Sequence, residues 1–201
     1  MSPQLSILIP SVPSRRMICY KLFDKLNNQI QNRNVEILVL LDNKKRSIGL
    51  KRDALLHIAN GDFIAFVDDD DDVSDDYIDS ILNAIESNPS VDIITFKQIV
   101  QINGENPFTV DFSINHVDNQ QAYKNNQGLW QDLKRRPFHV CIWARRIASK
   151  YHFPDASYGE DWHWAQRVLC EVKTETKIDK QIHYYFYNSN ITEAELIYPK
   201  E

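Results

Sequence analysis

Five consecutive aspartates, Asp68 to Asp72, form the densest group of chemically active side chains in the sequence. They directly follow a short apolar run, Phe63–Val67, so their carboxylates are expected to converge at the end of a buried strand. Crowded carboxylates repel one another and need a compensating cation, and hard oxygen ligands select Mg²⁺, Mn²⁺ or Ca²⁺. An EF-hand is excluded, because Val73 stands in place of the turn glycine and Asp79 in place of the bidentate glutamate. The run predicts a metal-binding loop, and the alternative is a solvated helix start.

A second pair of carboxylates, Glu160 and Asp161, lies between Gly159 and Trp162. A carboxylate beside bulky aromatic side chains is partly desolvated, which raises its pKa and suits a general base that takes a proton from a hydroxyl. Indole faces are also good platforms for the apolar faces of sugars, so Trp162 is a candidate for binding an acceptor. The structural alternative is that the two acids cap a helix and that Trp162 packs in the core.

Histidine and cysteine spacing does not indicate other metal chemistry. The six histidines form no H-x-x-x-H or H-E-x-x-H pattern, so a zinc hydrolase is not indicated and each is interpreted as structural. They are His57, His116, His139, His152, His163 and His183. The three cysteines form no C-x-x-C pair and are interpreted as reduced packing residues. They are Cys19, Cys141 and Cys170.

Four short apolar runs have the pattern of strands buried on both faces of a parallel sheet. They are Leu5–Ile9, Val35–Leu41, Phe63–Val67 and Val91–Phe96. Helical apolar spacing lies between each pair, and Ser74 is the expected N-cap of the third helix, with Asp75 and Asp76 in its first turn. The alternation predicts a doubly wound α/β sheet.

Ligands of a doubly wound sheet bind beyond the carboxyl ends of its strands. This rule selects three polar loops, Pro10–Arg15, Asp42–Ser47 and Asp68–Val73. The acidic run belongs to one of them, which favours a metal-binding loop over a solvated helix start.

The second half of the chain has a different pattern. Gln98–Ile102 and Phe108–Phe112 flank Asn103 and Gly104, which predicts a hairpin and an antiparallel addition to the sheet. Residues 113–128 are polar and irregular, as in a mobile loop over a site. Apolar spacing then predicts one helix over residues 142–151 and another over 162–169.

Size and charge limit the function further. A chain of 201 residues fits one domain with one site. Its net charge is −5 and the acidic excess lies around residues 68–76, which argues against nucleic-acid binding. The first apolar run, broken at Pro10, is too short for a signal peptide or a membrane span, so a cytoplasmic protein without a transmembrane segment is expected.

Taken together, five segments resemble glycosyltransferase family 2. Leu5–Ser11 is similar to the family's opening strand and nucleoside loop, and Val35–Asp42 to its second strand with a base-binding aspartate. Gly49–Asp53 resembles the G-x-x-R-N segment, and Ala59–Asp71 the A-x-G-x-[YF]-I-x-[FL]-x-D-x-D-D run with its D-x-D motif. Gly159–Asp161 resembles the late E-D element. The match runs through almost the whole chain.

The resemblance implies a GT-A fold, a Rossmann-like and mainly parallel mixed sheet flanked by helices, with a small antiparallel addition. It implies one domain over residues 1–201, with a nucleotide-binding half, 1–96, and an acceptor-binding half, 97–201.

It also implies roles for individual residues. Asp42 would contact the nucleobase, Asp68 the ribose, and Asp70 a Mn²⁺ or Mg²⁺ ion that bridges the diphosphate. Asp161, with Glu160 beside it, would supply the catalytic base. The other candidates for nucleotide-sugar binding are Pro10, Ser11, Arg52 and Asp69, and Trp162 is the candidate for acceptor binding.

The implied reaction moves one sugar from a nucleotide-diphospho-sugar, with a UDP-sugar favoured, to a hydroxyl of a glycan, a lipid-linked or a protein acceptor. It proceeds with inversion in one displacement, and the metal stabilises the departing diphosphate. The chain has no Q-x-x-R-W element of the processive synthases, which favours transfer of a single sugar.

The sequence departs from the family pattern at several positions. Asp53 replaces the usual Asn, and Val12 and Pro13 replace a common Tyr-Asn pair. Asn188 and Asn190 stand where Arg and His are frequent, which leaves a third metal contact open, and His183 is a candidate for it.

Two other functions remain open at this point. A haloacid-dehalogenase-like phosphatase also places D-x-D after an apolar strand, but Val73 stands where it needs a Thr and the motif follows two strand–helix units. A nucleotide-sugar-binding domain without catalysis would need no Asp161, so the retained Glu160–Asp161 pair favours an enzyme.

Overall fold

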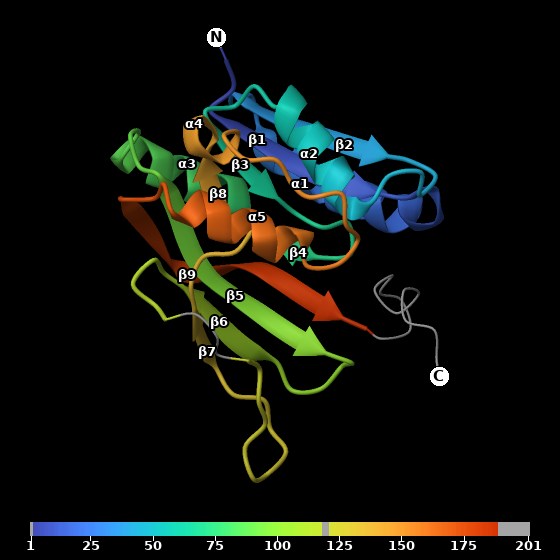
Figure 1. The fold of residues 1–201 in the computed structure, drawn as a ribbon, viewed down its shortest axis with the longest axis vertical. Helices are drawn as coiled ribbons and strands as arrows, with labels where there is room; N and C mark the ends of the chain where they lie inside the picture. The colour runs from blue at the N-terminus through green and yellow to red at the C-terminus, as the bar shows by residue number, and fades with distance from the viewer. Residues whose placement is uncertain (1, 118–120, 189–201) are drawn as a thin grey trace.

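The apolar run at the start of the chain forms β1 (Leu5–Ser11), which is buried along its whole length. The computed structural model describes residues 2–117 and 121–188 (Figure 1). Strand β1 pairs in parallel with β2 (Val35–Leu41) on one side and β3 (Phe63–Phe66) on the other. The predicted strands are confirmed, and their carboxyl ends meet at one edge of the sheet.

Three helices connect these strands: α1 (Arg16–Ile30), α2 (Ile48–Ile58) and α3 (Tyr77–Ser87). Because β2 and β3 lie on opposite sides of β1, right-handed connections place α1 and α2 on opposite faces of the sheet. Ser47 caps α2 by accepting a hydrogen bond from the backbone N–H of Leu50 at 3.2 Å.

The predicted N-cap of the third helix, Ser74, is wrong by two residues. The N-cap of α3 is Asp76, so Asp75 and Asp76 precede the helix. The chain stays extended through β4 (Asp72–Val73), which pairs with a later strand, and the helix begins only after the turn that follows.

The predicted hairpin is confirmed, but its first strand, Gln98–Ile102, is continuous with the strand predicted over Val91–Phe96. Ile93–Ile102 is a single strand, β5, and its second half pairs antiparallel with β6 (Phe108–Phe112). The turn between them has positive φ at Asn103 and Gly104, 49° and 75°. Strand β7 (Leu133–Arg135) extends the sheet beyond β6, away from the helices (Figure 1). In the described part of the loop predicted over residues 113–128, Lys124 pairs with Glu105 in the β5–β6 turn, whereas the Ser113 hydroxyl donates at 2.9 Å to Glu175, farther along the chain.

The helix predicted over residues 142–151 is mostly wrong. Ile142–Ala144 forms β8, which lies antiparallel between β3 and β5, and only Arg145–Ala148 forms a short helix, α4. A strand buried on both faces needs apolar residues on each, and its spacing over three residues cannot be told from that of a buried helix.

Two late elements complete the site. Helix α5 (Glu160–Leu169) confirms the last predicted helix and begins two residues earlier. Strand β9 (Glu175–Tyr187), which the sequence did not predict, runs parallel to β5 and antiparallel to β4, beneath the acidic loop. The main path through the mixed sheet is β2-β1-β3-β8-β5-β6-β7, and off this path β9 pairs with β4 and β5. In the described part of the chain, no helix is long and apolar enough to cross a bilayer.

Candidate active site

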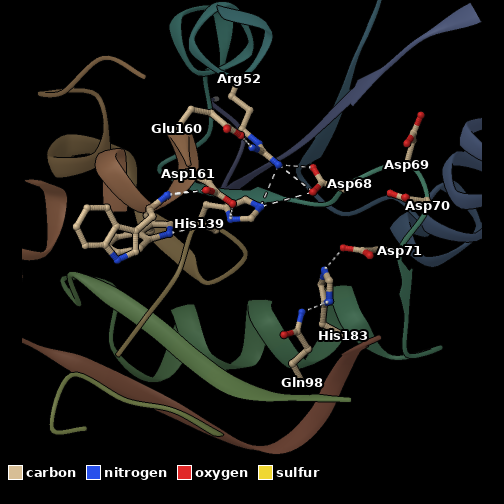
Figure 2. Close-up of polar contacts among 12 residues, drawn as sticks. Arg52, Asp68, Asp69, Asp70, Asp71, Gln98, His139, Glu160, Asp161 and His183 are labelled. Atoms are coloured by element: carbon tan, nitrogen blue, oxygen red, sulfur yellow. Dashed lines mark hydrogen bonds and ion pairs between the residues drawn. The ribbon is translucent and has the colours of Figure 1, made fainter. Parts of the chain in front are cut away.

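Arg52, on α2, joins the three elements that meet at the edge of the sheet (Figure 2). Its guanidinium donates to both carboxylate oxygens of Asp68, at 2.7 and 2.8 Å, and to Glu160 at the start of α5. It also lies 3.2 Å from Nε2 of His139. Burial alone would raise the pKa of Asp68, but the charge of Arg52 outweighs it and holds that pKa below its ordinary value. A single buried cation therefore fixes α2, the acidic loop and α5 relative to one another.

The two acids of α5 have different surroundings. The Glu160 side chain is 4% exposed and faces Arg52, whereas that of Asp161 is 23% exposed. Burial raises the pKa of Glu160, and Arg52 offsets this only in part. The backbone N–H of Trp162 donates to Oδ1 of Asp161 at 2.7 Å. Of the pair, Asp161 is the more exposed to solvent.

The aromatic residues around α5 divide into core and surface. Trp164 is fully buried, and its ring centroid lies 4.5 Å from that of Phe153 and 5.2 Å from that of Trp143. Trp162, in contrast, is 45% exposed, so the alternative that it packs in the core is wrong. Its indole lies at the surface, with its ring centroid 4.9 Å from that of His163.

Arg15, at the end of the short 3₁₀ helix η1 (Pro13–Arg15), neutralises part of the acidic loop. It pairs with Asp69 at 2.9 Å and with Asp70, while the Ser11 hydroxyl donates to Asp69 at 2.6 Å. Burial raises the pKa of Asp69 to about 6 despite these partners, and burial likewise raises that of Asp70. The sequence selected the Pro10–Arg15 loop but not the arginine itself, because its partners are more than fifty residues away.

Asp71 lies deepest in the acidic loop and faces His183 of β9. Neither of its carboxylate oxygens has a hydrogen-bond partner in the described chain, and Oδ2 lies 3.5 Å from Nε2 of His183. Burial, together with Asp68 and Asp70, raises the pKa of Asp71, and burial lowers that of His183 to about 4. Gln98 lies 3.1 Å from Nδ1 of His183 and orients the ring.

These donors fit a divalent cation. Residues 2–117 and 121–188 hold no ready-made cluster of three metal-binding side chains, but the unsatisfied oxygens of Asp71 and the neutral imidazole of His183 face one another below Asp70. The carboxylate oxygens suit Mn²⁺ or Mg²⁺, whereas an imidazole is a ligand of transition metals rather than of Mg²⁺. Asn190, the other position considered for a metal contact, lies outside the described residues.

The end of β2 carries the predicted nucleobase contact. Asp42 Oδ1 accepts from the backbone N–H of Lys44 at 3.1 Å and lies 3.2 Å from Nζ of Lys51, whereas its buried Oδ2 has no partner among the described residues. Lys51, which sequence reasoning missed, is buried and also donates to the Ser11 carbonyl at 3.3 Å. Pro10 and Ser11 pair with the last residues of β2, so the structure brings the predicted nucleobase residues together.

The start of α2 packs closely against the segment before α5. Gly49 donates its N–H to the Ala156 carbonyl at 3.1 Å, and a Cβ at this position would lie 2.0 Å from the Pro154 carbonyl oxygen. Asp53, which replaces the usual Asn, lies 3.1 Å from the His152 ring and accepts from the Phe153 N–H at 3.0 Å. The Gly49–Asp53 segment thus positions Arg52 against Glu160.

Comparisons with known proteins agree with this architecture. The sequence model of Glycosyl transferase family 2 matches residues 24–153. Among solved structures, the chain is similar to TarS 1–349 of S. aureus in complex with UDP-GlcNAc (TM-score 0.63, 14% identity, 92% of this chain and 59% of that chain). It is also similar to the same protein with UDP (TM-score 0.63, 14% identity, 92% and 61%) and to TarS 1–349 alone (TM-score 0.62, 15% identity, 91% and 60%).

At this level of identity the likeness shows the fold, and the chain spans about three-fifths of the length of these structures. No curated protein matches the chain. The family match covers more than half of the sequence, and it identifies a glycosyltransferase rather than the phosphatase considered as an alternative. This chain belongs to glycosyl transferase family 2.

Proposed function

We propose that this chain is a metal-dependent, inverting glycosyltransferase that moves one sugar from a UDP-sugar to an acceptor hydroxyl. The observation that carries the proposal is the group formed by Arg52 with its partners Asp68, Glu160 and His139, which we call the Arg52 junction. It lies between the acidic loop and a partly exposed carboxylate, Asp161. We also propose that residues 1–201 form one domain, with the donor bound mainly by residues 1–96 and the acceptor mainly by 97–201.

The nucleobase is proposed to bind beside Asp42, Pro10 and Ser11. The buried, unpartnered Oδ2 of Asp42 needs a hydrogen-bond donor, and the N3–H of uracil supplies one. Neutral cytosine presents a lone pair at the same position and would be repelled. The TarS structures were solved with UDP-GlcNAc and with UDP, which agrees with a UDP-sugar donor.

The ribose and diphosphate are proposed to bind along the acidic loop. Asp68 is held by Arg52 and would contact the ribose, while Asp69 and Arg52 complete the nucleotide-sugar site. Asp70 is the proposed metal ligand, and Asp71 and His183 lie below it as further donors. When bound, Mn²⁺ or Mg²⁺ would stabilise the negative charge of the departing diphosphate as a Lewis acid.

The chemical step is proposed to rest on Asp161. Its carboxylate accepts the proton of the acceptor hydroxyl, and the resulting oxygen nucleophile attacks the anomeric carbon opposite the diphosphate, which inverts the configuration. Trp162 would hold the acceptor, a glycan or a lipid-linked or protein hydroxyl, against its exposed indole. Glu160 keeps Arg52 and the start of α5 in place.

Thermal unfolding with UDP, GDP, CMP and dTDP, each with and without Mn²⁺, tests the donor site. UDP is expected to raise the midpoint most, and only when Mn²⁺ is present. Transfer from a panel of UDP-sugars then separates an enzyme from a binding domain without catalysis, since the latter would bind UDP and release no UDP from a sugar donor. A response to CMP equal to that of UDP would remove the role given to Asp42.

A further inference from the structure

His139, which sequence reasoning treated as structural, lies in the middle of the Arg52 junction (Figure 2). It is 5% exposed and lies shortly before β8, which begins at Ile142. One ring nitrogen, Nε2, lies 3.2 Å from Arg52 and 3.7 Å from Asp68. The other, Nδ1, lies 3.4 Å from Oδ2 of Asp161. The imidazole therefore lies between Asp68 of the acidic loop and Asp161, the proposed base.

The partners of the ring decide where its proton lies. A guanidinium only donates hydrogen bonds and stays protonated in proteins, so the contact between Arg52 and Nε2 of His139 is a hydrogen bond when Nε2 accepts. In that tautomer the ring proton lies on Nδ1, which is buried and has no other partner among the described residues. Oδ2 of Asp161, 3.4 Å from Nδ1, is the acceptor within reach of this N–H. Hydrogen bonds of catalytic groups are often long in free enzymes and tighten when substrate binds, so 3.4 Å fits such a contact.

Packing holds the ring in this orientation. The His139 ring lies 5.1 Å from that of Phe138 and 6.4 Å from that of Phe66, measured between centroids. The His139 carbonyl accepts a hydrogen bond from the indole N–H of Trp143 at 3.2 Å. A ring fixed by its backbone and by two aromatic neighbours loses little freedom when it orients another side chain.

We propose that His139 is a positioning residue for the proposed base: its Nδ1–H holds Oδ2 of Asp161 while the Trp162 N–H holds Oδ1. Two donors on different oxygens fix the plane of the carboxylate, so that one lone pair faces the acceptor hydroxyl. Because Arg52 binds both Asp68 and Nε2 of His139, the same junction ties the base to the donor side of the site. This inference rests on the role proposed for Asp161.

Two substitutions at His139 separate its two nitrogens. The amide nitrogen of Asn falls near the place of Nδ1, and that of Gln near the place of Nε2. His139→Asn is therefore expected to keep much of the turnover, whereas His139→Gln lowers kcat about tenfold to hundredfold with little change in KM for the donor. A structural role would instead lower kcat in both variants in proportion to their loss of thermal stability. Equal kcat in the wild type and in His139→Gln would overturn the proposal.

The Asp161→Asn background tests whether His139 acts through the carboxylate. Adding His139→Gln to Asp161→Asn is expected to cause no further loss of kcat, because the group that it positions is already gone. A further tenfold loss or more would assign His139 another role.

A measurement without turnover keeps this inference separate from the proposed function. Nitrogen-15 NMR of the histidine rings is expected to report the Nδ1–H tautomer at His139, with its Nδ1 signal shifted in Asp161→Asn. The opposite tautomer would overturn the inference even in an active enzyme. If no UDP-sugar is turned over but the tautomer and its dependence on Asp161 are observed, the proposed reaction fails and the His139–Asp161 contact stands.

Discussion

Glu160 and Asp161 are adjacent in the chain, yet their side chains meet different partners. The Glu160 side chain is buried and paired with Arg52, whereas the Asp161 side chain is partly exposed to solvent. A buried acid paired with a buried cation contributes to stability and rigidity, while an accessible acid held by two donors can exchange a proton with a substrate. We infer that the E-D element combines a structural residue with a chemical one.

Substitution of each acid is expected to have a different effect. Asp161→Asn should lower kcat by about 10²–10⁴ and leave UDP affinity and stability nearly unchanged, because it removes only the proton acceptor. Glu160→Gln should lower the free energy of unfolding by about 1–3 kcal/mol, because Arg52 loses one of its two carboxylate partners and keeps the other, Asp68. Steady-state kinetics and urea unfolding of both variants measure the two effects. The reverse pattern, with turnover lost in a stable Glu160→Gln, would exchange the roles.

Asp69 gives the site a pH dependence. Its pKa is raised to about 6 in the folded chain, so the folded state holds its proton more tightly than the unfolded state does. The stability from this proton is full below the unfolded pKa of about 4 and is lost as pH rises through about 6. Without metal, the free energy of unfolding is expected to be about 1 kcal/mol higher at pH 5 than at pH 7.5 from this group alone.

Asp69→Asn is the control for this prediction, since its side-chain oxygen can still accept from the Ser11 hydroxyl. Urea unfolding at the two pH values should show a smaller pH effect in the variant than in the wild type. Identical pH effects would mean that Asp69 is ionised in the folded chain.

At the scale of elements, the contact between α2 and the segment before α5 decides whether Arg52 reaches Glu160. Gly49→Ala would place a methyl group 2.0 Å from the Pro154 carbonyl oxygen and 3.2 Å from Cβ of Glu160. Backbone atoms cannot move aside as a flexible side chain can, so α2 and α5 must separate. The expected loss is about 1–3 kcal/mol of unfolding free energy, with a further fall in kcat as the junction opens.

Asp53→Asn is a matched substitution in the same helix. Its side-chain oxygen can still accept from the Phe153 N–H, and it restores the residue that the family pattern carries. We expect less than about 1 kcal/mol of change in stability and wild-type turnover. If Gly49→Ala were as mild as this control, the close approach of α2 would not matter to the site.

How much of the fold the sequence predicted depended on the range of the contacts involved. Strands β1 to β3 were predicted because burial on both faces produces continuous apolar runs. Strand β8 was missed because three buried residues carry no period, and β9 because many of its residues in the first half are exposed and polar. Its partners, β4 and β5, lie far away in the chain.

The same limit applies to the candidate site. Its acids were recognised because they stand together in sequence after a strand or before a helix. Arg15, Lys51 and His139 were not, because each acquires a function only through contacts with residues brought near by the sheet. A cluster of buried acids needs positively charged or hydrogen-bond-donating side chains beside it, but no local sequence pattern shows which residues supply them.

At the scale of the whole molecule, the two halves of the chain share one sheet. Strand β8, from the second half, lies between β3 and β5 of the central sheet, and Trp143 of β8 packs against Trp164 of α5. Removing the second half would leave β3 unpaired on one side and expose its apolar face to water. The donor and acceptor parts of the site are therefore expected to form and unfold together.

The positions of the tryptophans allow a direct test of this coupling. All four, Trp130, Trp143, Trp162 and Trp164, belong to the second half of the sequence, whereas the long helices α1, α2 and α3 belong to the first. In urea, tryptophan fluorescence reports the second half and far-UV circular dichroism mainly the first. We expect coincident transitions, as for a single cooperative unit, and we expect residues 1–96 expressed alone to remain unfolded. Separate transitions would divide the donor-binding and acceptor-binding parts into independent domains, and the Arg52 junction would then be a contact between them, open to rearrangement when substrates bind.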